Sequence, residues 1–156
     1  MRTELIVVGR TTDKHFEAGI NDYASRIAHY MPFTIHVVPE LRNTKSLTTE
    51  QQKTAEGEML LKLLQPHDWV VLLDEHGQEL RSVELAAWLE RRRAAARRLV
   101  FIIGGPYGFS PDIYQRANEQ LSLSRLTFSH QMVRLVFVEQ IYRACTIIKG
   151  EPYHHE

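Results

Sequence analysis

The sequence predicts an open α/β fold in which a mainly parallel sheet is covered by helices on both faces. Residues 5–8, 69–73 and 99–103 are unbroken apolar runs, as is typical of strands that are buried on both faces. Helical patterns separate these runs, so the elements alternate β-α through five repeats. With 156 residues, the chain is long enough for a substantial core and is expected to form one domain spanning residues 1–156.

The first half of the chain contains two strands and two helices. The strand 5–8 closes at Gly9, and a second strand ends before Pro39 because proline cannot extend the ladder. Apolar residues recur at the spacing of a helix face between these strands, and Thr48 or Thr49 is expected to cap the next helix. We therefore expect a helix over 13–30, a strand over 34–38, a mobile polar loop over 41–46 and a helix over 48–64.

The second half continues the alternation. Ser110 and Pro111 are typical of an N-cap followed by proline in the first helical turn. The strand 69–73 ends at the polar segment 74–77. We then expect a helix from 82 that ends near arginines 91–93 and 97–98, the strand 99–103, a helix from 111, a short strand around 121–124 and a final helix over 130–149.

A glycine cluster, Gly104-Gly105-Pro106-Tyr107-Gly108, follows the apolar run 99–103. Ligands of open α/β sheets bind at the carboxyl ends of strands, and glycine lets the main chain approach a ligand closely. The spacing matches neither the P-loop nor the dinucleotide fingerprint, and Pro106 removes one backbone donor. The cluster is therefore either a plain turn or part of a pocket that binds through carbonyls, a few amides and apolar walls.

The final helix has apolar residues on every side, which predicts burial on every side. One side is expected to pack on the sheet and another on a second copy of the chain. The alternative is the central helix of a monomer. We favour a homodimer, because so small a domain has little interior with which to surround a helix.

Composition narrows the function classes. Nineteen basic residues balance nineteen acidic ones, so the net charge does not indicate a nucleic-acid-binding protein. A local basic patch is still compatible with this total. Cys145 lies inside the apolar helix and is expected to be a small buried hydrophobe. We expect a cytoplasmic protein, because there is a single cysteine and no leader or membrane-spanning pattern is seen. For the same reason we expect no membrane partner. The histidines show no metal-ligand spacing, so no metal is expected, and hydrolase motifs are absent.

Two polar pairs interrupt the apolar helix. His130 and Arg134 are spaced i, i+4, and so are Glu139 and Arg143. The second pair could bond to each other, with the acid first. Polar groups at the start of so apolar a helix indicate either a capped terminus or part of a site.

Several motifs follow one another along the chain in the same order as in the RlmH family of bacterial SPOUT-class methyltransferases, and the chain therefore resembles that family. The motifs are L-L-D-x-x-G near residue 73, I-G-G-P-x-G at 103–108, L-S-L-S-x-L-T-F at 121–128, then H-Q-M-V-R and E-Q-I-Y-R-A, and a G-E-P-Y-H ending. The resemblance covers essentially the whole chain. It implies methylation of N3 of a pseudouridine in large-subunit (23S) ribosomal RNA with S-adenosylmethionine as cofactor. It also implies a homodimer with a C-terminal trefoil knot, which periodicity would not predict because protein connections are normally unknotted.

The resemblance also assigns residues to the cofactor pocket. Ser129 departs from it, since the family more often has proline there; this serine could instead cap the following helix. The implied cofactor-binding residues are Leu73, Gly104, Gly105, Leu123, Ser124, Arg125, Leu126, Thr127 and Phe128.

The expected chemistry is methyl transfer to a ring nitrogen that carries a proton, which calls for a base. We expect His130 to be that base, with Arg134 and Arg143 holding RNA phosphate or developing negative charge. Tyr142 is expected to stack or hydrogen-bond near the target base. Tyr153 and His154 are expected to close the site from the other protomer's tail.

A non-catalytic alternative remains. The chain could be a dimeric ribosome-binding factor with a vestigial pocket, held to RNA by the arginines at 91–93 and 97–98. Binding of S-adenosylmethionine would distinguish the enzyme from this binding factor. Within the enzyme hypothesis, Arg143 could equally have a structural role by pairing with Glu139. Whether the substrate is free RNA, a subunit or the assembled ribosome is not encoded in any motif.

Overall fold

The computed structural model describes residues 2–155 and is built around one five-stranded sheet. The strand order is β2-β1-β4-β3-β5, and every neighbouring pair is parallel. This confirms the predicted parallel α/β sheet. The strands are β1 (Arg2–Val8), β2 (Phe33–Val38), β3 (Asp68–Glu79), β4 (Arg98–Ile103) and β5 (Glu119–Ser122).

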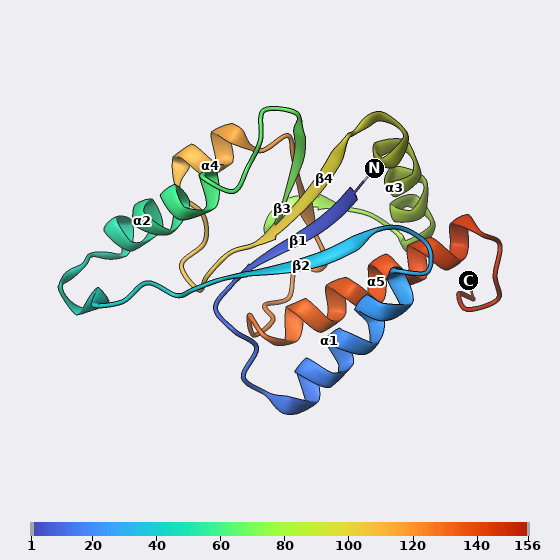
Figure 1. The fold of residues 1–156 in the computed structure, drawn as a ribbon, viewed down its shortest axis with the longest axis horizontal. Helices are drawn as coiled ribbons and strands as arrows, with labels where there is room; N and C mark the ends of the chain where they lie inside the picture. The colour runs from blue at the N-terminus through green and yellow to red at the C-terminus, as the bar shows by residue number, and fades with distance from the viewer. Residues whose placement is uncertain (1, 156) are drawn as a thin grey trace.

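Helices cover both faces of the sheet, also as expected. On one face α1, α3 and α5 surround the larger core, and α2 and α4 cover the opposite face (Figure 1). The helices are α1 (Lys14–Ile27), α2 (Thr49–Leu61), α3 (Ser82–Ala95), α4 (Pro111–Arg116) and α5 (Met132–Ile148), with a short 3₁₀ turn, η1 (Thr44–Ser46), in the expected polar loop.

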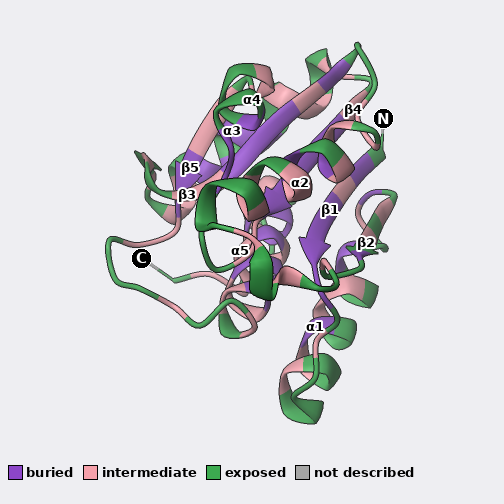
Figure 2. Cartoon of the chain, turned by 90° about the vertical axis from the view of Figure 1, so that its left-hand side faces the viewer, coloured by how far each residue is buried: buried purple, intermediate pink, exposed green. Residues whose placement is uncertain are grey.

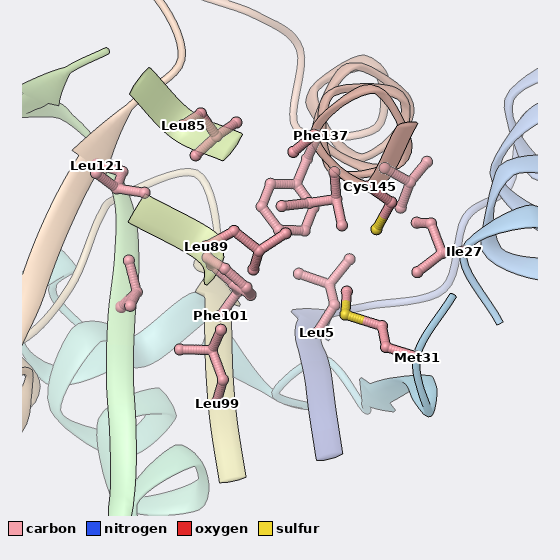
Figure 3. Packing of buried hydrophobic residues seen from close by; sticks show 14 of the residues in the cluster. Leu5, Ile27, Met31, Leu85, Leu89, Leu99, Phe101, Leu121, Phe137 and Cys145 are labelled. Atoms are coloured by element: carbon pink, nitrogen blue, oxygen red, sulfur yellow. The ribbon is translucent and has the colours of Figure 1, made fainter. Parts of the chain in front are cut away.

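Strands β1 and β4 are buried along most of their length, whereas β3 is buried mainly over residues 68–72 (Figure 2). In the larger core the Phe101 ring of β4 packs on the Phe137 ring of α5, with centroids 4.9 Å apart (Figure 3). Cys145 is 1% exposed in the same core, and burial raises the pKa of its thiol to about 11. This cysteine is therefore the small buried hydrophobe that the sequence predicted.

Side-chain caps fix where several helices begin. Thr48, rather than Thr49, caps α2: its hydroxyl accepts the Gln51 N–H at 3.1 Å, and the Gln51 side chain accepts the Thr48 N–H at 2.8 Å. Ser110 accepts the Ile113 N–H at 3.4 Å and Pro111 follows it, as predicted for α4. These bonds satisfy backbone donors that a helix start leaves without partners.

Strand β3 is longer than the apolar run predicts. It leaves its ladder after Leu73 and rejoins it at Gln78, and both residues pair with Leu121 of β5. We call the intervening residues 74–77 the β3 excursion. Their polar character indicated the end of a strand, and only pairing with β5 reveals that the strand resumes.

Other boundaries also differ from the sequence-based prediction, and α1 and α2 each end three residues earlier than expected, at Ile27 and Leu61. Strand β5 begins at Glu119, whose carboxylate accepts bonds from the indoles of Trp69 at 2.7 Å and Trp88 at 3.0 Å. Helix α5 begins at Met132 rather than residue 130. Ser129 caps the turn before it by accepting the Met132 N–H at 3.0 Å, which confirms the capping alternative for this serine.

Helix α5 packs against α1 and α3 and is not buried on every side within one chain, so burial on every side would require a second copy. Met132 is 37% exposed, and Val136, one turn later, is only partly buried. The sheet and two neighbouring helices cannot surround a helix completely. Within the described part of the chain, no helix combines the length and apolar character needed to span a bilayer.

Candidate active site

A cavity of about 660 Å³ lies where the β3 excursion and the carboxyl ends of β4 and β5 meet. Its walls are the excursion, the loop of residues 104–109 that follows β4, which we call the glycine loop, and the segment 122–130. Three distant parts of the sequence converge there because parallel strands end at the same edge of a sheet. Eight of the nine predicted cofactor residues line this cavity: Leu73, Gly104, Gly105, Leu123, Ser124, Leu126, Thr127 and Phe128.

Arg125 is the ninth predicted residue, and its side chain does not line the cavity. That side chain is 86% exposed and forms an ion pair with Glu79 at 3.2 Å.

Asp74 is held rigidly at the wall of the cavity. The Tyr114 hydroxyl donates to its Oδ2 atom, and the His76 N–H donates to Oδ1 at 2.9 Å. Burial alone would raise the pKa of Asp74, but these hydrogen bonds outweigh it and hold the pKa below its usual range. Asp74 therefore presents a fixed negative charge beside the cavity.

The charge of the lining distinguishes among ligand classes. Asp74 and Glu75 are both lining residues, and among the described residues of the lining there is no lysine or arginine. Apolar side chains such as Ile103, Phe109 and Leu123 provide much of the remaining wall. This combination suits a partly apolar ligand with positive charge, and it disfavours a phosphate-rich nucleotide.

Comparisons with known proteins agree with this geometry. A family model described as "Predicted SPOUT methyltransferase" matches residues 1–154. The chain belongs to the SPOUT methyltransferase family.

Full-length relatives carry a more specific name. Proteins named ribosomal RNA large subunit methyltransferase H are 62% identical in Bacteroides fragilis, 60% in Phocaeicola vulgatus and 49% in Porphyromonas gingivalis. Each match covers 100% of this chain and 100% of the relative. The resemblance to the RlmH family is thereby confirmed.

His130 is the one predicted catalytic residue that lines the cavity of this SPOUT chain. It lies in the turn between Ser129 and helix α5, and its side chain is exposed. Because the Ser129 cap fixes this turn, the imidazole is carried at a defined place on the cavity rim. A histidine there is accessible to a substrate that arrives from solvent.

Arg134 occupies a different environment from the predicted one. It is 2% exposed, and its guanidinium donates to the carbonyls of Val8 at 2.7 Å and Gly9 at 2.8 Å. A side chain enclosed in this way does not reach RNA phosphate. Arg134 instead ties the end of β1 to the first turn of α5, because its guanidinium supplies a donor to the carbonyls of the last strand residue and of the residue after it.

The remaining predicted residues gather near the other end of α5, outside the cavity lining. We call Glu139, Tyr142, Arg143, Tyr153 and His154 the C-terminal cluster. Arg143 donates to Glu139 at 2.6 Å, lies 3.0 Å from the Nδ1 atom of His154 and stacks 4.8 Å from the Tyr153 ring centroid. The Tyr142 and Tyr153 rings meet edge to face at 4.8 Å.

This cluster orders the tail against α5 and α1. The Glu139 pairing that the sequence allowed for Arg143 is present, and Tyr153 also donates to Glu139 at 2.9 Å. Within one chain, the structure therefore does not bring the C-terminal cluster to His130.

Sequence reasoning missed two side chains at the cavity wall. Asp74 was visible in the L-L-D motif but was treated as the end of a strand. Tyr114 had no distinguishing signal, since one tyrosine in a short helix is not unusual. Only the fold brings its hydroxyl to Asp74, forty positions away along the chain.

Proposed function

We propose that this protein transfers a methyl group from S-adenosylmethionine to N3 of a pseudouridine in large-subunit ribosomal RNA. One observation carries the proposal: a single cavity collects eight predicted cofactor residues together with His130. The names of its full-length relatives support ribosomal RNA as the substrate class. The pseudouridine and its N3 atom rest on the resemblance to the RlmH family.

The cavity fits the proposed cofactor in size and chemistry. Its volume of about 660 Å³ falls within the range of about 300 to 1,000 Å³ that is typical of small-molecule sites. Leu73, Leu123 and Phe128 offer apolar contacts for an adenine ring, and the backbone of Gly104 offers polar ones. Asp74 and Glu75 suit the positive charge of a sulfonium. When bound, S-adenosylmethionine supplies an electrophilic methyl group.

His130 is proposed to act as the base. N3 of the target ring carries a proton, and its lone pair becomes a good nucleophile when that proton leaves. An imidazole on the cavity rim can accept the proton as the new N–CH₃ bond forms. The rigid turn before α5 then contributes by orienting the imidazole, which is what a transfer between two bound partners requires.

A homodimer is proposed to complete the site. The partly open face of α5 around Met132 and Val136 is apolar and unpartnered within the chain, as the interface of a two-fold dimer would be. In that arrangement the C-terminal cluster of one protomer would approach the His130 cavity of the other. Arg143, Tyr142, Tyr153 and His154 would then contact the RNA near the target.

Three further features belong to the same proposal. A C-terminal trefoil knot is proposed from the resemblance to the RlmH family. Residues 1–156 are proposed to act as one domain, since both cores share one sheet. Because the proposed substrate is ribosomal RNA, the cytoplasm is the proposed location of the protein.

The decisive experiment replaces His130 by alanine and measures cofactor binding and methylation separately. Calorimetry should give the same dissociation constant for S-adenosylmethionine, while kcat on large-subunit RNA falls by about 100-fold or more. His29→Ala, at an exposed histidine in the turn that follows α1 and outside the cavity lining, serves as the matched control. Unchanged turnover would remove His130 from the base role.

The same calorimetry tests the proposal as a whole. Micromolar binding of S-adenosylmethionine by the unaltered protein is the expected result. If none were detected at millimolar cofactor, the non-catalytic ribosome-binding alternative would replace the enzyme.

A further inference from the structure

A second, smaller cavity of about 180 Å³ adjoins the first. Residues 105–108 of the glycine loop and His130 line both cavities, so this part of the chain forms their common wall. The rest of its lining is mostly polar and comes from the end of β1, the segment 40–44 and α2: Val8, Glu40, Leu41, Thr44, Gln52, Lys53 and Glu56. Its volume is below that of typical cofactor sites and suits a single ring.

Helix α2 fixes the common wall through two consecutive residues. The Gly105 N–H donates to Glu56 Oε1 at 3.1 Å, near one end of the glycine loop. At the other end Ser110 lies so close to Gly57 that a Cβ there would be 2.4 Å from the Ser110 Oγ atom. The loop is therefore held at both ends by α2, and its position between the cavities is defined.

Glu56 has a second oxygen that the protein does not use. Among the described residues, no donor bonds to Oε2, and the side chain is only partly buried, at the edge of the smaller cavity. Burial raises the pKa of Glu56 and the hydrogen bond from Gly105 opposes that rise. A carboxylate with one oxygen fixed and the other available is a strong, directed acceptor for an N–H group.

We propose that the smaller cavity receives the target base and that Glu56 Oε2 accepts the N1–H of pseudouridine. This inference rests on the proposed function and deepens it by naming the residue that recognises the substrate. The pseudouridine ring is joined to its ribose through carbon, so its N1 atom carries a hydrogen. In uridine the same position is the glycosidic nitrogen and has no hydrogen to donate.

The two cavities then divide the tasks. A base bound with N1–H toward Glu56 presents N3–H to a different side of the ring, and His130 lies on the wall shared with the cofactor cavity. The N3 atom is thereby placed between base and methyl donor. Glu56 touches the base but takes no proton from N3, so its role is to determine specificity.

Glu56→Gln separates recognition from loop support. The amide oxygen of glutamine can still accept the Gly105 N–H, while the amide nitrogen replaces the acceptor at Oε2 with a donor. The substrates are large-subunit particles from a strain that lacks this methyltransferase, prepared with pseudouridine or with uridine at the target position. Single-turnover methylation of both is followed by mass spectrometry.

The unaltered protein should prefer the pseudouridine particle, and Glu56→Gln should lower its rate on that particle by about 10- to 100-fold while barely changing the rate on uridine. Binding of S-adenosylmethionine, measured by calorimetry, should be unchanged. Glu40→Gln, at the other carboxylate of the smaller cavity, is the matched control and should keep the preference.

Two outcomes would overturn the inference. One is a preference that Glu56→Gln leaves intact. The other is an equal loss on both substrates with weaker cofactor binding, which would make Glu56 only a support for the glycine loop. Neither outcome affects the proposed function, which fails only if the unaltered protein methylates no large-subunit particle.

Discussion

Asp74 shows how single residues set the electrostatics of the cavity. Its side chain is 7% exposed, and the hydrogen bonds from Tyr114 and His76 hold its pKa below the usual range against the effect of burial. Burial and the adjacent carboxylate in turn raise the pKa of Tyr114, which keeps that phenol a donor. The negative wall that suits a cationic ligand therefore depends on a neutral hydroxyl from another element.

Tyr114→Phe tests this dependence through pH. Because the pKa of Asp74 is lowered in the folded protein, its carboxylate stabilises the fold above its ordinary pKa of about 3.9, and this contribution is lost as pH falls through the lowered value. Without the Tyr114 hydroxyl the pKa rises. The variant should therefore be less stable by about 2 kcal/mol at pH 7, with a difference that shrinks toward pH 3.

Urea denaturation at several pH values measures this difference in the free energy of unfolding. Tyr107→Phe is the control, since Tyr107 lines the same cavity but is 53% exposed. A difference between wild type and Tyr114→Phe that is constant across the pH range would mean that the hydroxyl does not act through Asp74.

At the scale of elements, the contact of β3 with β5 builds the cavity. The β3 excursion leaves the ladder, and the backbone of β5 lies directly against Gly77. The Glu119 carboxylate fixes the start of β5 through two indoles and Arg92. These contacts place residues 122–128 opposite the glycine loop.

Gly77→Ala should disturb this crossing. The added methyl group would lie 2.7 Å from backbone atoms of residues 120 and 121, which cannot move without breaking the ladder. We expect a loss of about 1–3 kcal/mol in unfolding free energy together with weaker S-adenosylmethionine binding. Denaturation and calorimetry measure the two effects.

Gly19→Ala is the matched glycine control. Its methyl group would meet only the side chain of Leu135, which can rotate, and alanine favours the α1 helix. If both variants were equally stable, the close passage at Gly77 would not constrain the fold.

For the whole molecule, the placement of the C-terminal cluster is the central feature. It is ordered around Arg143 and Glu139 but lies outside the lining of the cavity that contains His130. One chain therefore holds two separate parts of the proposed site. A two-fold dimer through α5 would join each part to its counterpart on the other protomer.

Mixed dimers of differently tagged protomers test this arrangement. A dimer with His130→Ala in one protomer and Arg143→Ala in the other keeps one intact shared site, so we expect about half of the wild-type methylation rate. A dimer of one unaltered protomer with one that carries both changes has no intact shared site and should be inactive. The reverse pattern would show that each site is confined to one protomer, and circular dichroism checks that all variants fold.

Much of the fold and most of the residues that line the larger cavity could be predicted from the sequence. Apolar runs such as 99–103 identify strands buried on both faces, because no polar residue could be tolerated there. Ser110 and Thr48 identify helix starts, because their hydroxyls satisfy local donors. The glycine loop was predicted as a pocket candidate at the carboxyl end of a parallel strand, and the resemblance to the RlmH family added Leu73 and Leu123 to that pocket.

By itself, the sequence determined what depends on neighbours along the chain: the parallel α/β class, the helix caps, the buried cysteine and the three loops of the cavity. Only the tertiary structure decided that β3 resumes after residue 77, that Arg134 is enclosed by the end of β1, and that Tyr114 reaches Asp74. These features join residues that are far apart in sequence. Their partners are chosen by packing and by the need of buried polar groups for hydrogen bonds, and neither leaves a periodic signal in the chain.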